Sequence, residues 1–147
     1  MKELILRGQI YYVDFYDMDS HVIKGKRPAV IVSNDLHNKN SGTVIVVPIT
    51  TTIKDYPTSI DIHLESGIHG QINCADIMTV DKRQLGDYKD QIPDSLIQEL
   101  DRTLSLELQI GGRESFSYLL QQKKVERAKK AYEEELNRLK SYEEGCR

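Results

Sequence analysis

The sequence predicts a mainly β fold of the α+β class: a small, strongly bent sheet or half-open barrel, followed by helix. Two observations support this prediction. Short runs of β-branched and aromatic residues follow one another through the first 80 residues, with polar turns and no helical pattern between them. Apolar residues recur at helical spacing only after Pro93. We therefore expect a barrel domain over residues 1–112 and a C-terminal helical extension over residues 113–147.

The composition is that of an ordinary globular protein, with 39% hydrophobic and 29% charged residues in a chain of 147. No apolar run approaches the ~18 residues that a membrane span requires. The apolar patch within residues 1–7 is too short for the core of a signal peptide, so we expect a cytoplasmic protein with no membrane partner. Cys74 and Cys146 match no disulfide or metal-ligand spacing, so we expect free thiols, no metal site and no cofactor.

The net charge of -3 argues against attraction of the whole surface to nucleic acid. Any site for a polyanion must therefore be local. Basic residues cluster at Lys24, Lys26, Arg27 and Lys39, and again at Lys82 and Arg83. This pattern fits a small basic cleft on an acidic body, and the alternative is a set of solvated loop charges.

The first strands can be placed in chain order. Ile10–Phe15 is rich in aromatic and β-branched residues, which is typical of a strand. The next strand is the apolar run after Pro28. Residues 16–27 between them have no periodicity and carry His21, so we expect a long loop of the kind that often covers an active site. Leu36–Gly42 is then expected to form a polar turn.

Two of the expected strands end in polar chemistry. Arg27 directly precedes the buried run that starts at Pro28, so its guanidinium should face a cleft, although a structural ion pair is the alternative role. Thr43–Thr50 is β-branched almost throughout and continues into Thr51 and Thr52, so this strand delivers hydroxyl groups to its own exit. Three further short strands complete the expected sheet: Thr58–Leu64, Gln71–Cys74 and Ile77–Val80.

Helix is expected only in the last third of the chain. Pro93 opens a helix whose leucines recur at spacings of three and four, and Gly111 with Gly112 should stop it. A second helix is expected from Glu114 to about Tyr142. It carries one apolar stripe: Val125, Ala128, Tyr132, Leu136 and Leu139. Residues 113–147 carry a net charge of +2 against -5 for residues 1–112, and we expect this amphipathic tail to pack on its own barrel or on a partner.

Four motifs, in this order along the chain, resemble the MazF/PemK toxins of bacterial toxin–antitoxin modules. They are Arg7-Gly8-x-Ile10-Tyr11, Gly25-x-Arg27-Pro28-x-Val30-Ile31-x-Ser33-Asn34-Asp35, Thr43-Val44-Ile45-Val46-x-Pro48-Ile49-Thr50 and Thr79-Val80-Asp81-Lys82. The resemblance covers roughly residues 6 to 110, and four ordered motifs are much more specific than one.

The resemblance implies an SH3-like, CcdB-type half-open barrel that forms a homodimer and is restrained by a cognate antitoxin. It also implies a metal-independent, sequence-specific endoribonuclease that cuts single-stranded mRNA and so inhibits translation and growth. In such cleavage the 2′-hydroxyl attacks the adjacent phosphate, which leaves a 2′,3′-cyclic phosphate and a 5′-hydroxyl end. The catalytic Arg and Thr of the family fall on Arg27 and Thr50.

The chemistry of these residue types agrees with that implication. Arg27 offers a planar fork of donors that matches phosphate oxygens, and Thr50 offers a hydroxyl. Because its pKa is above ~12, an arginine is a poor base, so we expect Arg27 to stabilise the transition state. His21 is a candidate for proton transfer, with a solvated loop histidine as the alternative. We expect RNA contacts from six further residues: Lys24, Lys26, Ser33, Asn34, Thr51 and Thr52. Asp81 and Lys82 are expected to stabilise a turn.

The chain departs from the family pattern at four positions. Val22 and Ile23 stand where the family usually has Glu-Gln, and Ala75 and Met78 lie near the usual acidic residue and Arg. Contacts to base edges carry specificity, so these changes should alter the cut sequence before they abolish cutting. Two alternatives stay open: a catalytically weak barrel that only binds the antitoxin, and a CcdB-like gyrase poison.

Overall fold

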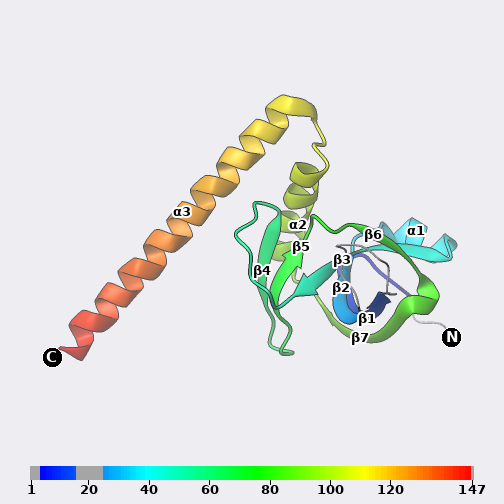
Figure 1. Cartoon of the computed structure of the whole chain (residues 1–147), viewed down its shortest axis with the longest axis horizontal. Helices are drawn as coiled ribbons and strands as arrows, with labels where there is room; N and C mark the ends of the chain where they lie inside the picture. Colours follow the sequence, from blue (N-terminus) through cyan, green and yellow to red (C-terminus); the bar gives the residue numbers. More distant parts are fainter. Residues whose placement is uncertain (1–3, 16–24, 147) are drawn as a thin grey trace.

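The computed structural model describes residues 4–15 and 25–146. In these ranges the elements follow one another as β1 (Gln9–Phe15), β2 (Gly25–Ile31), α1 (Asp35–Asn40), β3 (Thr43–Thr50), β4 (Ser59–His63), β5 (His69–Asn73), β6 (Met78–Asp81), the 3₁₀ helix η1 (Lys82–Gln84), β7 (Leu85–Gln91), α2 (Asp94–Glu107) and α3 (Gly112–Gly145). Figure 1 shows the strands wrapped around one another beside α2, with α3 as a long arm. The expectation of a mainly β fold with a C-terminal helix is confirmed.

The sheet is antiparallel and bends at β3. The strands run in the order β4-β5-β3-β2-β1-β7. Strand β6 lies outside this order and pairs with β3. The first half of β3 pairs with β6, its middle pairs with β2, and its last two residues pair with β5. One eight-residue strand therefore belongs to two sheets and turns the chain from one to the other. Among the described strands this barrel is open, with β4 and β7 at its ends.

Both faces of the central strands are buried, which explains their nearly continuous apolar sequences. On one face Val30, Val47 and Ile72 pack with Leu100 of α2. On the other face the bend encloses a second cluster, which we call the inner cluster: Tyr11, Val13, Phe15, Ala29, Ile31, Val44, Val46 and Val80. The barrel thus holds one core inside its bend and another beneath α2.

The segment expected to be a polar turn, Leu36–Gly42, is instead mostly helical, because α1 runs from Asp35 to Asn40. The expectation was wrong because Asn34 is an effective N-cap: its side-chain oxygen accepts a hydrogen bond from the backbone N–H of His37 at 2.8 Å. The expected loop also ends earlier than residue 27, since β2 begins at Gly25. Residues 1–3, 16–24 and 147 lie outside the described part.

Strand β7 was not predicted from the sequence. Its segment, Leu-Gly-Asp-Tyr-Lys-Asp-Gln, is mostly exposed and has few strand-forming residues. It is a strand because it pairs with the edge of β1, with two register shifts along the pairing. The rings of Tyr88 and Tyr11 also meet edge to face, with their centroids 5.7 Å apart. Tertiary pairing here overrides local propensity.

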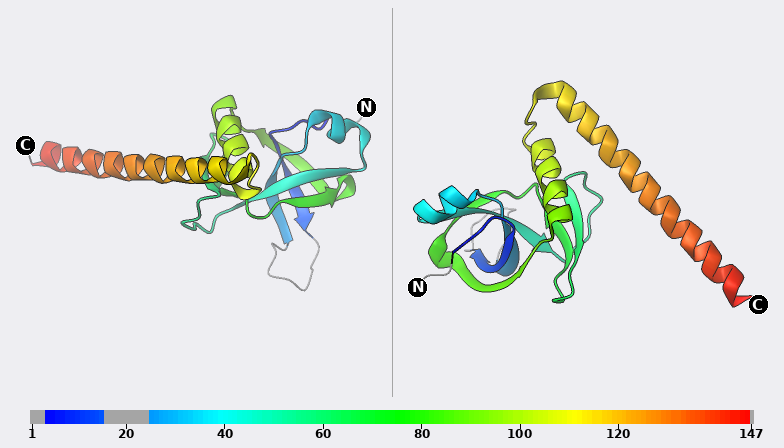
Figure 2. Two further views of the ribbon diagram at one scale, coloured as in Figure 1. Left: turned by 90° about the horizontal axis from the view of Figure 1, so that it is seen from above. Right: turned by 180° about the vertical axis from the view of Figure 1, so that it is seen from behind.

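The helix α3 runs back past α2 and β4 and then extends beyond the barrel. Its start is set by Gly111, whose φ of 94° is in the left-handed region. Figures 1 and 2 show a straight helix that lies beside the barrel only over its first part. None of its described residues is buried. Within the ranges that the structure describes, no helix combines the length and the apolar character needed to cross a membrane.

Candidate functional site

Arg27 and Thr50 occupy neighbouring positions on adjacent strands. The register between β2 and β3 places Ala29 opposite Pro48 and Val30 opposite Val47. The pairing itself ends at Ala29 and Pro48, and the same register continued by two residues would set Arg27 against Thr50. Directly opposed residues share a face of the sheet, so both side chains emerge on the face of the inner cluster. Both residues are half-buried.

Lys26 does not join this pair. Because successive side chains of a strand alternate between faces, Lys26 lies on the opposite face from Arg27. There it lies opposite Asp14 of β1 and lines a small cavity of about 320 Å³ together with Tyr12. The two adjacent basic residues of the motif therefore serve different surfaces.

The strand exit after Thr50 is polar, as expected from the sequence. The Oγ1 atom of Thr50 accepts a hydrogen bond from the backbone N–H of Thr52 at 3.1 Å. Thr51 and Thr52 are exposed. The hydroxyl of Thr50 is thus oriented by the turn that it begins, and two further hydroxyls follow at the surface.

Gly70 allows β5 to pass against the backbone of Thr50. A Cβ atom at this position would lie 2.1 Å from the carbonyl oxygen of Thr50, and the φ of Gly70 is +123°. Its neighbour Gln71 stands opposite Thr50 in the β3–β5 pairing. The Oε1 atom of Gln71 also accepts a hydrogen bond from the backbone N–H of Lys54 at 2.9 Å. These two residues position the segment that follows Thr50.

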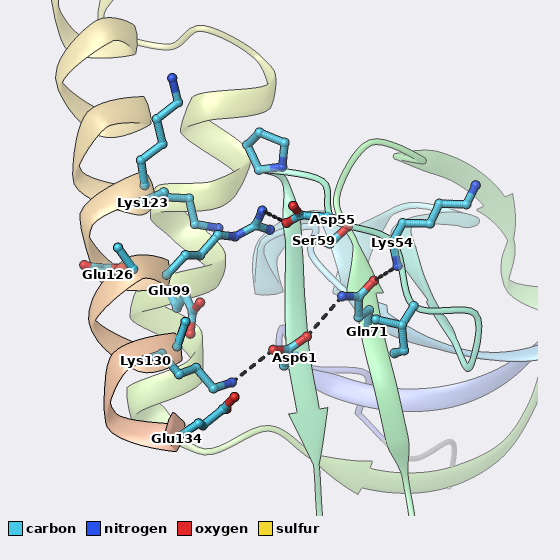
Figure 3. Close-up of a pocket in the computed structure, with 16 residues that line it drawn as sticks. Lys54, Asp55, Ser59, Asp61, Gln71, Glu99, Lys123, Glu126, Lys130 and Glu134 are labelled. Atoms are coloured by element: carbon cyan, nitrogen blue, oxygen red, sulfur yellow. Dashed lines mark hydrogen bonds and ion pairs between the residues drawn. The ribbon is translucent and has the colours of Figure 1, made fainter. Parts of the chain in front are cut away.

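A polar groove of about 860 Å³ separates this segment and β4 from α3. Figure 3 shows a chain of contacts across it: Gln71 Nε2 donates to Asp61 Oδ1 at 3.1 Å, and Lys130 Nζ donates to Asp61 Oδ2 at 3.0 Å. The pKa of Asp61 is lowered chiefly by the hydrogen bond from Gln71, with Lys130 assisting. The pKa of Lys130 is in turn raised by Asp61.

Helix α3 also contacts the segment after Thr50 directly. Arg127 pairs with the carboxylate of Asp55 at 2.6 Å and donates to the backbone carbonyl of Tyr56. The helical extension is therefore connected to the polar exit of β3. The sequence alone did not indicate Gln71, Asp61 or Arg127 for this role, because the contacts join segments up to 72 residues apart.

Ser33 and Asn34 lie at the other end of β2 from Arg27, about 20 Å along the chain at the rise of a strand. The Ser33 hydroxyl is buried, donates to Asn38 and accepts a hydrogen bond from the N–H of Ile45 at 2.9 Å. Asn34 caps α1. The structure thus gives both residues a supporting role in the fold. His21 and Lys24 lie outside the described residues.

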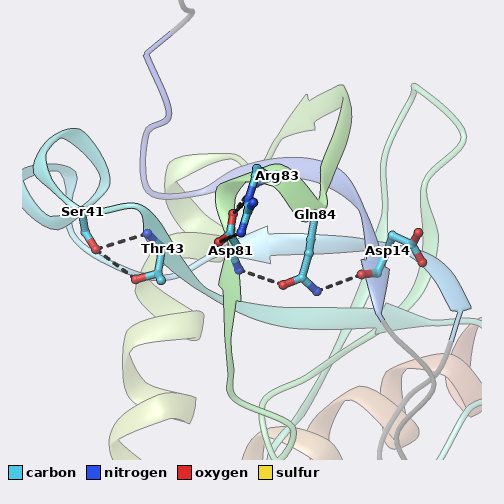
Figure 4. Close-up of polar contacts among 6 residues, drawn as sticks. All are labelled: Asp14, Ser41, Thr43, Asp81, Arg83 and Gln84. Carbon is cyan, nitrogen blue, oxygen red and sulfur yellow. Dashed lines mark hydrogen bonds and ion pairs between the residues drawn. The ribbon is translucent and has the colours of Figure 1, made fainter.

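The turn around Asp81 is held by local polar contacts, drawn in Figure 4. Asp81 forms an ion pair with Arg83 at 3.0 Å, and the bond lowers the pKa of the carboxyl group. The side chain of Gln84 accepts from the N–H of Asp81 at 2.9 Å and donates to the carbonyl of Asp14 at 3.0 Å. Asp81 does stabilise a turn, with Arg83 rather than Lys82 as its partner.

Both cysteines are free thiols, as expected. Burial raises the pKa of Cys74 to about 12, so this thiol stays neutral, whereas Cys146 is exposed. Across residues 4–15 and 25–146, no three His, Cys, Asp or Glu side chains gather closely enough to hold a metal ion.

Comparison with known proteins shows the family of the chain. Residues 6–108 match the family described as PemK-like, MazF-like toxins of type II toxin–antitoxin systems. The chain belongs to this family. The match contains Arg27, Thr50 and the whole described barrel, and it ends before α3.

Several relatives of this PemK/MazF chain are named as endoribonucleases. It is 30% identical over 103 residues to endoribonuclease MazF4 of Mycobacterium tuberculosis, which covers 70% of this chain and 91% of that protein. It is 26% identical over 110 residues to endoribonuclease EndoA of Bacillus subtilis, covering 71% and 95%.

The solved structures agree with the fold of this family member. One is a mycobacterial endoribonuclease in complex with its cognate antitoxin, 28% identical, with a TM-score of 0.64 and coverage of 74% of this chain and 99% of that one. Another is MazF from Deinococcus radiodurans, 21% identical, with a TM-score of 0.68 and coverage of 74% and 100%. The second supports the fold alone.

Proposed function

We propose that this chain is the toxin of a type II toxin–antitoxin module and a metal-independent endoribonuclease that cuts single-stranded RNA. The observation that carries the proposal is the pairing of β2 with β3 through Ala29 and Pro48, whose register, continued by two residues, would set Arg27 against Thr50 on one face of the sheet. These are the two positions that match the catalytic residues of the family. The matched relatives named as endoribonucleases favour this activity over gyrase poisoning.

In the proposed reaction the 2′-oxygen forms a bond to the adjacent phosphorus and loses its proton. The bond from phosphorus to the 5′-oxygen breaks, and the departing 5′-oxygen takes up a proton. Arg27 donates hydrogen bonds to the non-bridging oxygens, which carry the most negative charge in the transition state. The hydroxyl of Thr50 binds a further oxygen. His21 is proposed to transfer protons in these steps.

The proposed RNA contacts divide between the two sides of the site. Thr51 and Thr52, exposed beyond Thr50, and Lys24 and Lys26 are proposed to bind the phosphate backbone. Ser33 and Asn34 act indirectly, by holding the far end of β2 and the start of α1.

Base recognition should differ from that of relatives with charged residues near the site. Ala75 is exposed, and Met78 packs against the inner cluster, on whose face the Arg27–Thr50 pair emerges. Apolar side chains offer no hydrogen bonds to base edges there. We therefore propose a changed cut sequence with cutting retained.

We further propose that the chain forms a homodimer, that a cognate antitoxin binds and restrains it, and that it acts in the cytoplasm, where mRNA is translated. A barrel this small buries a modest core, and a dimer would cover additional apolar surface.

The test is to incubate the purified protein with a long RNA in EDTA and to map the ends of the products. We expect cleavage at a short recurring sequence, 5′-hydroxyl ends and an unchanged rate with chelator. Arg27→Ala protein is the control for contaminating nuclease. Absence of cutting together with retained antitoxin binding would favour the binding-only alternative, and inhibition of DNA supercoiling would favour a gyrase poison.

A further inference from the structure

Helix α3 presents an apolar stripe to solvent. Tyr118, Val125, Tyr132 and Leu139 recur every seven residues, so they lie along one side of the helix. Their exposed fractions are 69%, 52%, 70% and 56%. We call these four residues the outer stripe. Large apolar side chains that stay exposed in a continuous row mark a surface that a partner covers.

The barrel does not cover the outer stripe, because the side of α3 that faces the barrel is the polar one. Lys123, Arg127, Lys130 and Glu134 follow one another at spacings of three and four on the opposite side of the helix and line the polar groove. Lys123 donates to Thr103 of α2 at 2.8 Å, and Lys130 reaches Asp61 of β4. Figures 1 and 2 show the barrel on one side of α3 only, so the other side is open to a second helix.

The charges along α3 specify what kind of helix fits the outer stripe. Lys123, Arg127 and Lys130 face the barrel, so next to the outer stripe the first half of the helix carries Lys124 and Lys129, a net charge of +2. The second half carries Glu133, Glu135 and Glu143 with Lys140 next to the stripe, a net charge of -2. A second copy in antiparallel orientation brings the basic segment of each helix toward the acidic segment of the other. A parallel copy would place like charges side by side.

We propose that the outer stripe is a self-association surface on which the α3 helices of two copies pair in antiparallel orientation. The contact lies outside residues 6–108, the part shared with the relatives, so it adds to any dimer formed by the barrel. It does not depend on RNA cleavage. Burial of the stripe supplies the attraction, and the complementary halves set the direction.

Disulfide trapping tests the contact and its direction on the full-length protein. Cys146 is exposed and 14 residues from Tyr132, which is about 21 Å along a helix. In an antiparallel pair centred near Tyr132, two Cys146 residues stand about 40 Å apart and cannot bridge, whereas in a parallel pair they would meet. Tyr132→Cys in a Cys146→Ser background should therefore form a linked dimer under mild oxidation, and the wild type should not.

The matched control for trapping is Asn137→Cys in the same Cys146→Ser background, because Asn137 is exposed and lies off the outer stripe. We expect little linkage from it. Equal linkage from both variants would mean random collision and would overturn the proposal, as would linkage through Cys146 in the wild type.

Sedimentation measures the strength of the contact. Tyr132→Glu with Leu139→Glu should raise the dissociation constant of the α3 contact at least about tenfold, because charges replace two buried apolar groups. Asn137→Glu with Ser141→Glu adds the same charge to the same part of the helix off the stripe and should leave the mass unchanged. Circular dichroism checks that helicity is kept in both.

Equal masses for the wild type and the stripe variant at protein concentrations from roughly 1 to 100 μM would overturn the proposal. So would protection of the outer stripe from hydrogen exchange only when the antitoxin is added, since that result would assign the stripe to the antitoxin. A barrel dimer persisting in the stripe variant, with the larger wild-type assembly lost, supports it.

Discussion

Arg27 is half-buried on the face of the inner cluster, so in the proposed reaction its guanidinium would be partly removed from water and its hydrogen bonds to phosphate would gain strength. We expect Arg27→Ala to slow the chemical step by raising its activation free energy by roughly 2.7 to 4 kcal/mol, as for loss of an oxyanion donor. The effect on RNA affinity should be much smaller. Arg27→Lys should recover little, since a point charge lacks the fork. Single-turnover cleavage at saturating RNA measures this, and a normal rate for Arg27→Ala would exclude the role.

Thr50 tests whether only the hydroxyl matters. Thr50→Ala should slow cutting, because it removes both the group offered to phosphate and the acceptor for the Thr52 N–H. Thr50→Ser should recover most of the rate. Ser117→Ala, at an exposed position of α3 outside the proposed RNA contacts, is the control. If Thr50→Ser were as slow as Thr50→Ala under single-turnover conditions, the methyl group rather than the hydroxyl would be the functional part.

Gly70 and Gly67 form a natural matched pair for testing how β5 supports Thr50. Both have a positive φ, +123° and +96°, but an added Cβ meets the Thr50 carbonyl only at Gly70 and finds open space at Gly67. Gly67→Ala should cost about 1 kcal/mol of unfolding free energy from conformation alone, and Gly70→Ala at least about 2 kcal/mol more. Urea unfolding measures both. Equal losses of unfolding free energy in the two variants would show that the structure relieves the contact between the added Cβ and the Thr50 carbonyl without cost.

At the scale of the elements, the groove between α3 and the sheet depends on Asp61, whose pKa is lowered. A lowered pKa means that the ionised form is favoured in the folded protein. Its contribution to stability is therefore present above the unfolded pKa of 3.8 and is lost as the pH falls through the lower folded value. The contacts of β4 with α3 should accordingly weaken only in acid.

We expect both Gln71→Leu and Lys130→Met to raise the pKa of Asp61, because the hydrogen bond from Gln71 is the largest single cause of its lowering and Lys130 adds a hydrogen bond and a positive charge. Carbon-detected NMR titration of the carboxyl group measures both changes. Arg138→Met, whose ion pair with Glu135 lies within α3, is the control and should leave Asp61 unchanged. An unchanged Asp61 pKa in Lys130→Met would mean that α3 does not act on this carboxylate.

For the whole molecule, the expected boundary between residues 1–112 and residues 113–147 stays a prediction. Neither buried cluster contains a residue of α3, and the helix meets the rest of the chain through polar contacts at its surface. Such pairs contribute about 0–1 kcal/mol each. The truncated chain 1–112 should therefore keep a cooperative unfolding transition, with a loss of no more than about 4 kcal/mol. Thermal and urea unfolding check this, and a truncated chain without a cooperative transition would show that α3 belongs to the domain.

The sequence by itself determined the strands with continuous β-branched runs, the start of α2 and the two polar strand exits. It did so because burial on both faces demands an apolar run and because Arg27 and Thr50 adjoin such runs in the chain. It also carried the ordered motifs by which the family was identified. Local patterns of this kind need no knowledge of distant neighbours.

The tertiary structure alone decided the rest. β7 is a strand only because β1 offers it an edge. The positions of Gly70, Gln71 and Arg127 around Thr50, and the outward direction of the α3 stripe, depend on contacts between segments far apart in sequence. The physical reason is that pairing edges, close approaches and the choice of which helix face meets a neighbour are properties of two segments together. Neither segment encodes them alone.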